Sequence, residues 1–206
     1  SGAVESLATI ANPLGIADLL VQRMVNRGIP RERALACFWG LGSRGLLREG
    51  ISMRDFQEPY ARTAEEWAAW TLDDPSKVEL ADVVRNVHPT IIIGTSAQAG
   101  AFSETIIKDM AAHCERPIIM PLSNPTRKAE ALPSDILEWT GGRALIATGS
   151  PFQPVVHAGT THTIAQANNA LVFPGIGLGV AACRATRVSD GMILAAAEDV
   201  AKVVTV

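Results

Sequence analysis

Short apolar runs alternate with longer amphipathic stretches along most of the chain. Residues 90–94, 117–121 and 143–148 are compact apolar runs, as in the strands of a parallel sheet that is covered on both faces. Residues 78–87 repeat apolar side chains at a spacing of three, and residues 103–114 begin with a serine suited to cap a helix. This alternation predicts βαβ units, and therefore an α/β fold with a doubly wound, mainly parallel, Rossmann-like sheet.

The same pattern predicts the remaining elements. A strand is expected over residues 36–40. Residues 1–12 either form the first strand, in full or in part, or are a lead-in to the domain. Gly28 suits the end of the first helix, because glycine readily adopts the left-handed conformation found there. The expected helices that complete the pattern cover residues 14–28, 134–140, 174–186 and 189–203.

Composition excludes several classes of protein. The chain has 206 residues, 48% of them apolar, which is enough to bury a core. Lys and Arg number 18 against 21 Asp and Glu, a net charge of −3, whereas nucleic-acid-binding proteins normally carry a basic excess. No apolar run approaches the roughly 20 residues that span a bilayer, and the first residues show no secretory signal. Three well-separated cysteines fit a reducing cytosol, so we expect a cytoplasmic protein.

Ligands of doubly wound sheets bind at the carboxyl ends of the strands, so the residues after each strand are the main candidates for a site. Ser43 and Arg44 follow the strand expected at 36–40. An acid at this place favours NAD, whereas arginine accommodates the 2′-phosphate of NADP. Ser43 and Arg44 are both able to bind phosphate. The alternative is an ordinary glycine-rich turn with a solvated arginine.

Three further segments carry polar side chains that suit a ligand. Thr95 and Ser96 follow the strand at 90–94, where two hydroxyls would lie along a cofactor ribose, although strand-to-helix loops also favour such residues. Asn124 precedes a proline, which biases it to an extended backbone and offers an uncharged amide. The doublet of Asn168 and Asn169 either caps a helix or contacts a ligand.

Other catalytic chemistry is hard to find in the sequence. The four histidines lack metal-ligand spacing, and His157 and His162 are interpreted as solvated residues of a loop. Neither a GxSxG nucleophile motif nor a phosphate-binding P-loop is present. We therefore predict no catalytic residue and no metal ligand within the chain.

Five segments together resemble one family. They are GTSAQAGAF at 94–102, ERPIIMPLSNPT at 115–126, GRALIATGSPF at 142–152, IAQANNALVFPGIGLG at 164–179 and SDGM at 189–192. In order and spacing they closely resemble the C-terminal, NAD(P)-binding domain of malic enzymes over residues 14–203. The resemblance implies one NAD(P)-binding domain over residues 1–206.

The family resemblance also implies an activity. Malic enzymes oxidatively decarboxylate malate to pyruvate and carbon dioxide, with NAD or NADP as hydride acceptor and Mg or Mn to stabilise the enolate. By resemblance, Asn124 and Asn169 contact the substrate, while Asn124 and Asn168 lie beside the cofactor. Thr95 and Ser96 would also line the cofactor. The absence of an acid next to Ser43 and Arg44 shifts the expectation towards NADP, and the family is usually a homo-oligomer.

Two departures from the family pattern matter. Malic enzymes carry a catalytic Tyr, a catalytic Lys and acidic metal ligands in an N-terminal region that no segment here resembles. Tyr60 is the only tyrosine, and it lies in a connection that reads as surface. Of the family's glycine fingerprint after the first strand, only Gly15 remains in the stretch 7–15. The chain is therefore expected to be inactive alone, or, as the alternative, a degenerate non-catalytic relative that serves as a binding module.

Overall fold

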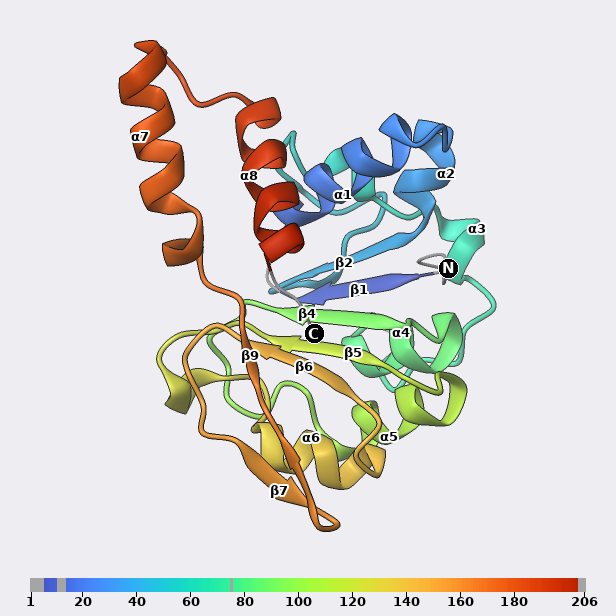
Figure 1. Cartoon of the computed structure of the whole chain (residues 1–206). Coiled ribbons are helices and arrows are strands. Elements are labelled where there is room, and N and C mark those ends of the chain that lie inside the picture. The colour runs from blue at the N-terminus through green and yellow to red at the C-terminus, as the bar shows by residue number, and fades with distance from the viewer. Residues whose placement is uncertain (1–5, 11–13, 75, 204–206) are drawn as a thin grey trace. The chain divides into compact units, whose positions relative to one another are not determined.

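Parallel strands of apolar residues build the centre of the fold, which a computed structural model describes for residues 6–10, 14–74 and 76–203. The sheet has the strand order β3-β2-β1-β4-β5-β6-β9, with only β3 antiparallel to its neighbour (Figure 1). Its strands are β1 (Leu7–Ile10), β2 (Phe38–Gly42), β3 (Gly45–Leu46), β4 (Ile91–Gly94), β5 (Ile118–Pro121), β6 (Leu145–Thr148) and β9 (Ala165–Gln166). The predicted doubly wound α/β sheet is confirmed, and of the two alternatives for residues 1–12 the structure shows a first strand, at Leu7–Ile10.

Helices cover both faces of the sheet, and adjacent residues of β4 show how the two faces divide. Ile92 is fully buried on the face that packs against α4 (Leu80–Val87), α5 (Glu104–His113) and α6 (Pro133–Thr140). Ile93 is buried on the opposite face, with α1 (Leu14–Asn26) and α2 (Arg31–Ala36). Successive side chains of a strand point to opposite faces, so a continuous isoleucine run serves both cores.

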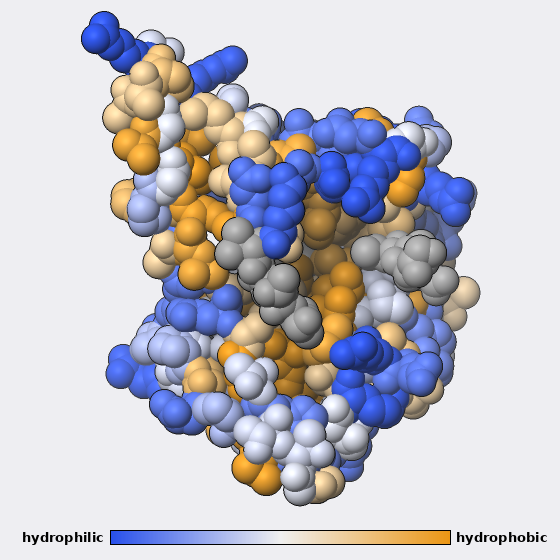
Figure 2. Space-filling model, viewed as in Figure 1, coloured by the Kyte–Doolittle hydropathy of each residue, from blue (hydrophilic) through white to orange (hydrophobic). Residues whose placement is uncertain are grey.

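The helix ends follow the local signals in the sequence. Gly28 has a φ of +88° just after α1, the left-handed conformation that glycine adopts without strain. The Ser103 hydroxyl accepts a hydrogen bond from the backbone N–H of Ile106 and so caps α5. Hydrophilic side chains cover the helices that flank the sheet, while apolar side chains show in a band over the strands between them (Figure 2).

Three expectations from the sequence need correction. The strand expected over 36–40 begins at Phe38, because Ala36 is the last residue of α2. His157 and His162 lie in a hairpin of β7 (Val155–His157) and β8 (Thr160–His162), with ring centroids 6.3 Å apart, and are half-buried rather than solvated in a loop. Tyr60 is 2% exposed and belongs to the core on the α1 face.

The chain divides into two compact units, Ser1–Gln166 and Ala167–Val206. The second unit contains α7 (Phe173–Cys183) and α8 (Asp190–Val203), close to the two helices expected there. The Ser189 hydroxyl accepts from the backbone N–H of Met192 at the start of α8. That the whole chain forms a single domain stays a prediction.

The connections contain short helices. They are the α-helix α3 (Ala64–Trp67) and the 3-10 helices η1 (Glu58–Tyr60), η2 (Thr126–Lys128) and η3 (Asn169–Leu171). In the described parts of the chain, every helix is too short or too polar to cross a membrane.

Candidate functional site

The order of the strands creates a switch point beside β1. The chain passes from β1 to β2 on one side and then returns to β4 on the other side of β1. At such a switch point the loops on either side diverge and leave a crevice at the carboxyl ends of the strands. The segments that follow β2, β4 and β5 carry Ser43, Ser96 and Asn124, so three predicted site residues lie at this edge.

One pocket joins the ends of β2 and β4. Its volume is about 360 Å³, and its lining includes Gly42 at the end of β2 and Ser43 just after it, together with Ser96 and Gln98 after β4. Apolar side chains such as Ile106 complete the wall. Lys77 and Glu79 also line the pocket, so one charge of each sign stands beside the small polar groups and the apolar surface. The mixture of polar and apolar surface suits a ring system that carries hydroxyl groups.

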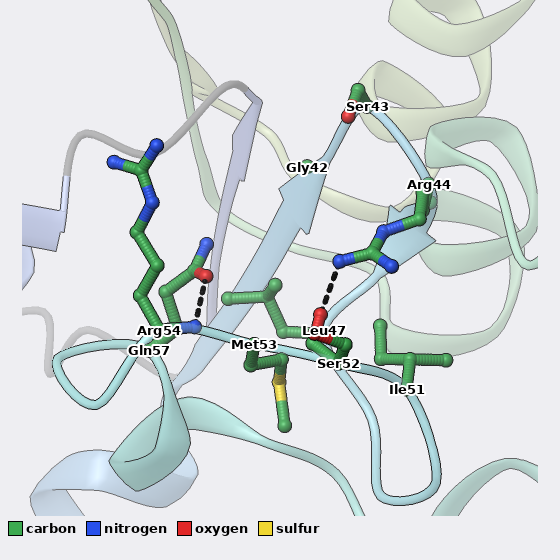
Figure 3. Close-up of a pocket in the computed structure, with 10 residues that line it drawn as sticks. Gly42, Ser43, Arg44, Leu47, Ile51, Ser52, Met53, Arg54 and Gln57 are labelled. Carbon is green, nitrogen blue, oxygen red and sulfur yellow. Dashed lines mark hydrogen bonds between the residues drawn. The ribbon is translucent and has the colours of Figure 1, made fainter.

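A second pocket of about 370 Å³ lies on the other side of the β2–β3 turn, where Arg44 and Ser52 line it. Figure 3 shows Arg44 reaching across this pocket, where its Nη2 donates to the main-chain carbonyl of Ser52. Arg54 points away from that contact, and its backbone N–H donates to Gln57 Oε1 at 2.9 Å. The turn itself, residues 42–45, thus contains an exposed arginine and no acidic residue.

The loop after β4 is tightly bonded. Thr95 is exposed, whereas Ser96 is turned inwards: its backbone N–H and its hydroxyl donate to Glu130 Oε1 at 2.7 and 2.8 Å. The hydroxyl of Ser96 also accepts from the N–H of Gln98 at 3.2 Å. Ala97 has a φ of +54°, a left-handed conformation that costs a non-glycine residue about 1 kcal/mol or more. The loop is therefore held in one shape by specific contacts.

Asn124 is exposed at the end of β5, and its orientation is fixed by the loop after β6. Its Oδ1 accepts a hydrogen bond from the hydroxyl of Ser150. Gly149 permits this approach, because a Cβ there would lie 2.1 Å from the carbonyl oxygen of Leu122. The Nδ2 group of Asn124 is a neutral donor, which suits a carboxylate or a carboxamide without adding charge.

The sequence did not identify Glu130, the residue that ties these loops together. Its side chain is 0% exposed, and its carboxylate accepts from both Ser96 and Ser123. One signal was available: Glu130 is a lone acid between Ala129 and Ala131 in an otherwise apolar stretch. A buried carboxylate needs several donors, so an acid in such a place indicates an internal network.

The remaining predicted residues lie elsewhere. Gly15 is the second residue of α1, and a Cβ added to it would meet no described atom within 4 Å beyond its own helix, so its place is open to a ligand or to solvent. Asn168 and Asn169 belong to the second unit, and Asn124 to the first. The Oδ1 of Asn168 accepts from the N–H of Ala170 at 2.9 Å, which caps η3. Asn168 is therefore a helix cap, which was one of the two interpretations of the doublet.

The donor side chains decide what the site could hold. Among residues 6–10, 14–74 and 76–203, no group of three or more His, Cys, Asp or Glu side chains is arranged to hold a metal ion. The described part of the chain therefore offers hydroxyl and amide donors at the sheet edge, a set that fits binding and orienting a ligand.

Comparison with known proteins agrees with this geometry. Residues 8–206 match the family described as "Malic enzyme, NAD binding domain". The chain is 49% identical over 181 residues to the "NAD-dependent malic enzyme" of Aliivibrio fischeri (strain ATCC 700601 / ES114), covering 87% of this chain and 32% of that protein. It is 48% identical over 195 residues to "NAD-dependent malic enzyme 3" of Bacillus subtilis (strain 168), covering 94% and 34%.

The Edwardsiella ictaluri (strain 93-146) "NAD-dependent malic enzyme" is 47% identical over 188 residues, covering 91% of this chain and 33% of that protein. The chain thus spans about a third of the length of these relatives. The match with the family covers all of the sheet except Leu7, the first residue of β1, and every loop of the candidate site. This chain belongs to the malic enzyme family, as its NAD binding domain.

Proposed function

We propose that this chain supplies the dinucleotide-binding part of an enzyme that oxidatively decarboxylates malate to pyruvate and carbon dioxide. The observation that carries the proposal is the pocket shared by Ser43 after β2 and Ser96 after β4, at the switch point of the sheet. Adenosine would occupy this pocket, and the nicotinamide would extend past β4 towards Asn124. When bound, the dinucleotide supplies the acceptor for the hydride.

In this proposal the chain's own residues bind and orient. Thr95 lies along the cofactor, and Gly15 at the start of α1 lets the pyrophosphate approach the helix N-terminus. Asn124 directs its amide at the carboxylate of the substrate or the carboxamide of the cofactor. From the family resemblance alone, Asn169 contacts the substrate and Asn168 the cofactor. The catalytic acid and base and the ligands of Mg or Mn would come from protein outside this chain.

The identity of the dinucleotide is a finer part of the proposal. The relatives described above are named NAD-dependent, which supports NAD. NADP also stays in the proposal. The turn that begins at Gly42, the last residue of β2, contains Arg44 and no acid, and an acid there would oppose the 2′-phosphate of NADP. Homo-oligomer formation is proposed from the family resemblance alone, and a cytoplasmic location from the three well-separated cysteines.

Calorimetric titration of the chain with NAD and with NADP tests the proposal. We expect micromolar binding of at least one of the two and no significant oxidation of malate by the chain alone. Malate oxidation at an ordinary enzymatic rate would contradict the division of labour proposed here. Failure to bind either dinucleotide would favour a degenerate, non-catalytic relative, an alternative motivated by the loss of glycines from the stretch 7–15, of which residues 11–13 lie outside the described structure.

A further inference from the structure

One buried carboxylate contacts both loops of the proposed cofactor site. Glu130 lies between η2 and α6, and its side chain is fully buried beneath the ends of β4 and β5. Its Oε1 accepts from the backbone N–H and the hydroxyl of Ser96 and from the hydroxyl of Ser123, and its Oε2 accepts from the N–H of Ser123 at 3.4 Å. Four donors from two loops thus converge on one side chain.

The network extends to the strained residue of the β4–α5 loop. The hydroxyl of Ser123 donates to Glu130 and accepts from the backbone N–H of Ala97 at 2.8 Å. Ala97 is the residue with a φ of +54°. A strained conformation persists only where its surroundings hold it. Here the Ser123 hydroxyl holds Ala97, and Glu130 in turn holds Ser123.

The main chain of Glu130 fixes the other end of the same loop. Its carbonyl oxygen accepts from the N–H of Phe102 at 3.0 Å, and the ring of Phe102 is 0% exposed. The loop is therefore pinned at its beginning through Ser96 and at its finish through Phe102. Ser123 directly precedes Asn124, so the same contacts also set where the Asn124 backbone begins.

Packing around the carboxylate is close. A Cβ placed on Gly94 would lie 2.7 Å from both Cγ and Cδ of Glu130 and 2.7 Å from Phe102 Cζ. The glycine at the end of β4 thus leaves the space that the glutamate side chain fills. A shorter acid would not reach the donors from the same backbone position.

We propose that Glu130 is the positioning residue of the dinucleotide site, whose buried carboxylate fixes the β4–α5 loop and the Asn124 loop in one geometry before any ligand binds. The inference rests on the proposed function for the identity of the ligand. Glu130 acts through Ser96, Ser123 and Ala97 and does not itself touch the cofactor. Ser96, whose hydroxyl is committed to Glu130, then belongs to the support of the site, and Thr95 is the exposed hydroxyl of the loop.

The test replaces Glu130 by glutamine in the 206-residue chain. Glutamine keeps the shape but loses the charge and one acceptor oxygen, which leaves donors of the network without partners. We expect amide hydrogen exchange over residues 95–101 to accelerate about tenfold, and the Kd for NAD to rise about tenfold, the loss associated with one strong hydrogen bond. The exchange of β1 and α1 is expected to stay unchanged.

Two further variants make the result decisive. Thr140→Val removes two buried hydrogen bonds away from both loops, one donated to Ile136 O in α6 and one accepted from the N–H of Ala144. It is expected to change neither the loop exchange nor the Kd for NAD. Ser123→Ala removes only the hydroxyl that connects Ala97 to Glu130. This variant replaces Glu130→Gln as the test if Glu130→Gln does not fold. It is expected to give the same changes to a smaller extent.

The possible outcomes separate the two proposals. Unchanged loop exchange in both Glu130→Gln and Ser123→Ala overturns the positioning role, whether or not the chain binds NAD. Faster exchange with an unchanged Kd for NAD overturns the link to the cofactor. Faster exchange in a chain that binds neither NAD nor NADP overturns the proposed function, while the shaping of the loops by Glu130 is supported.

Discussion

The turn after β2 and the loop after β4 line the same pocket but are held in different ways. A Cβ on Gly42, the last residue of β2, would meet nothing closer than 3.9 Å, whereas a Cβ on Gly94, the last residue of β4, would meet three atoms at 2.7 Å. Behind Gly94 stands the Glu130 network, and beyond Gly42 only Arg44 bridges the turn to the Ser52 carbonyl. The packed side can define where a ligand lies, and position 42 on the other side can change at little cost to the fold.

The largest expected effect comes from adding one methyl group to each of the two glycines. Gly94→Ala forces the new Cβ against the buried side chains of Glu130 and Phe102, which costs about 3 kcal/mol of unfolding free energy. Gly42→Ala places its Cβ in ordinary contact with Leu47, so it should change stability by about 0.5 kcal/mol or less. Urea denaturation of both variants measures the difference, and equal losses would remove the contrast between the two sides.

A smaller loss of stability is expected from a change at Tyr60, a buried side chain that supports the β2 side of the sheet. The Tyr60 hydroxyl donates to Asp18 Oδ1 in α1 at 2.7 Å, and its ring packs edge-on against Phe38 at 6.0 Å. Tyr60→Phe removes a hydrogen bond to a carboxylate and should cost about 2 kcal/mol of unfolding free energy. Thermal and urea denaturation check this value. A neutral result would mean that the β2 side owes little to this contact.

The same contact predicts a pH dependence of stability. Burial, and then the hydrogen bond to Asp18, raise the pKa of the Tyr60 hydroxyl above its ordinary value of about 10. The resulting contribution to stability is fully present below about pH 10 and decreases as the pH rises towards the pKa of the folded state. Because the chain has one tyrosine, tyrosinate absorbance reports Tyr60 alone. Its ionisation with an ordinary pKa in the folded chain would contradict this account.

The smallest expected effect is at the turn itself. Arg44→Ala removes an exposed guanidinium, so stability should stay unchanged while the ratio of NAD to NADP affinity rises about threefold, as for a solvated ion pair. Paired calorimetric titrations measure this ratio. Arg33→Ala, at an exposed position in α2, is the control for net charge and should leave the ratio unchanged. Equal losses for both dinucleotides would show that Arg44 does not distinguish them.

The main elements were predictable because their signals are local. Compact isoleucine runs identified β4 and β5, and Gly28 and Ser103 marked helix ends where the structure places them. The short elements were missed because a local signal needs several residues to become visible. The helix α2 has six residues and β3 has two, too few to display a periodicity. The hairpin of β7 and β8 is only three residues long on each strand, so its histidines read as part of a loop.

The candidate site divides along a similar line. The residues proposed to face a ligand lie just after strands, so Ser43, Thr95 and Asn124 could be proposed from the order of elements. Glu130 was missed, because its partner Ser96 is 34 positions away and only the folded sheet brings the two together. Tyr60 was misjudged because proline and acidic residues around it suggest a surface, whereas its ring is buried under α1.

Trp39 gives the proposed site an optical reporter. It lies in β2, three positions before Gly42, and is 9% exposed, with its ring centroid 5.2 Å from that of Trp70. The guanidinium of Arg62 lies 4.0 Å from the centre of the Trp39 ring and restrains the indole further. Indole emission overlaps the absorption of a reduced nicotinamide, so bound NADH should accept excitation energy from the indole. We therefore expect NADH binding to quench the tryptophan fluorescence and to produce emission from the cofactor at a longer wavelength. Occupancy of the cleft could then be followed in the unlabelled chain.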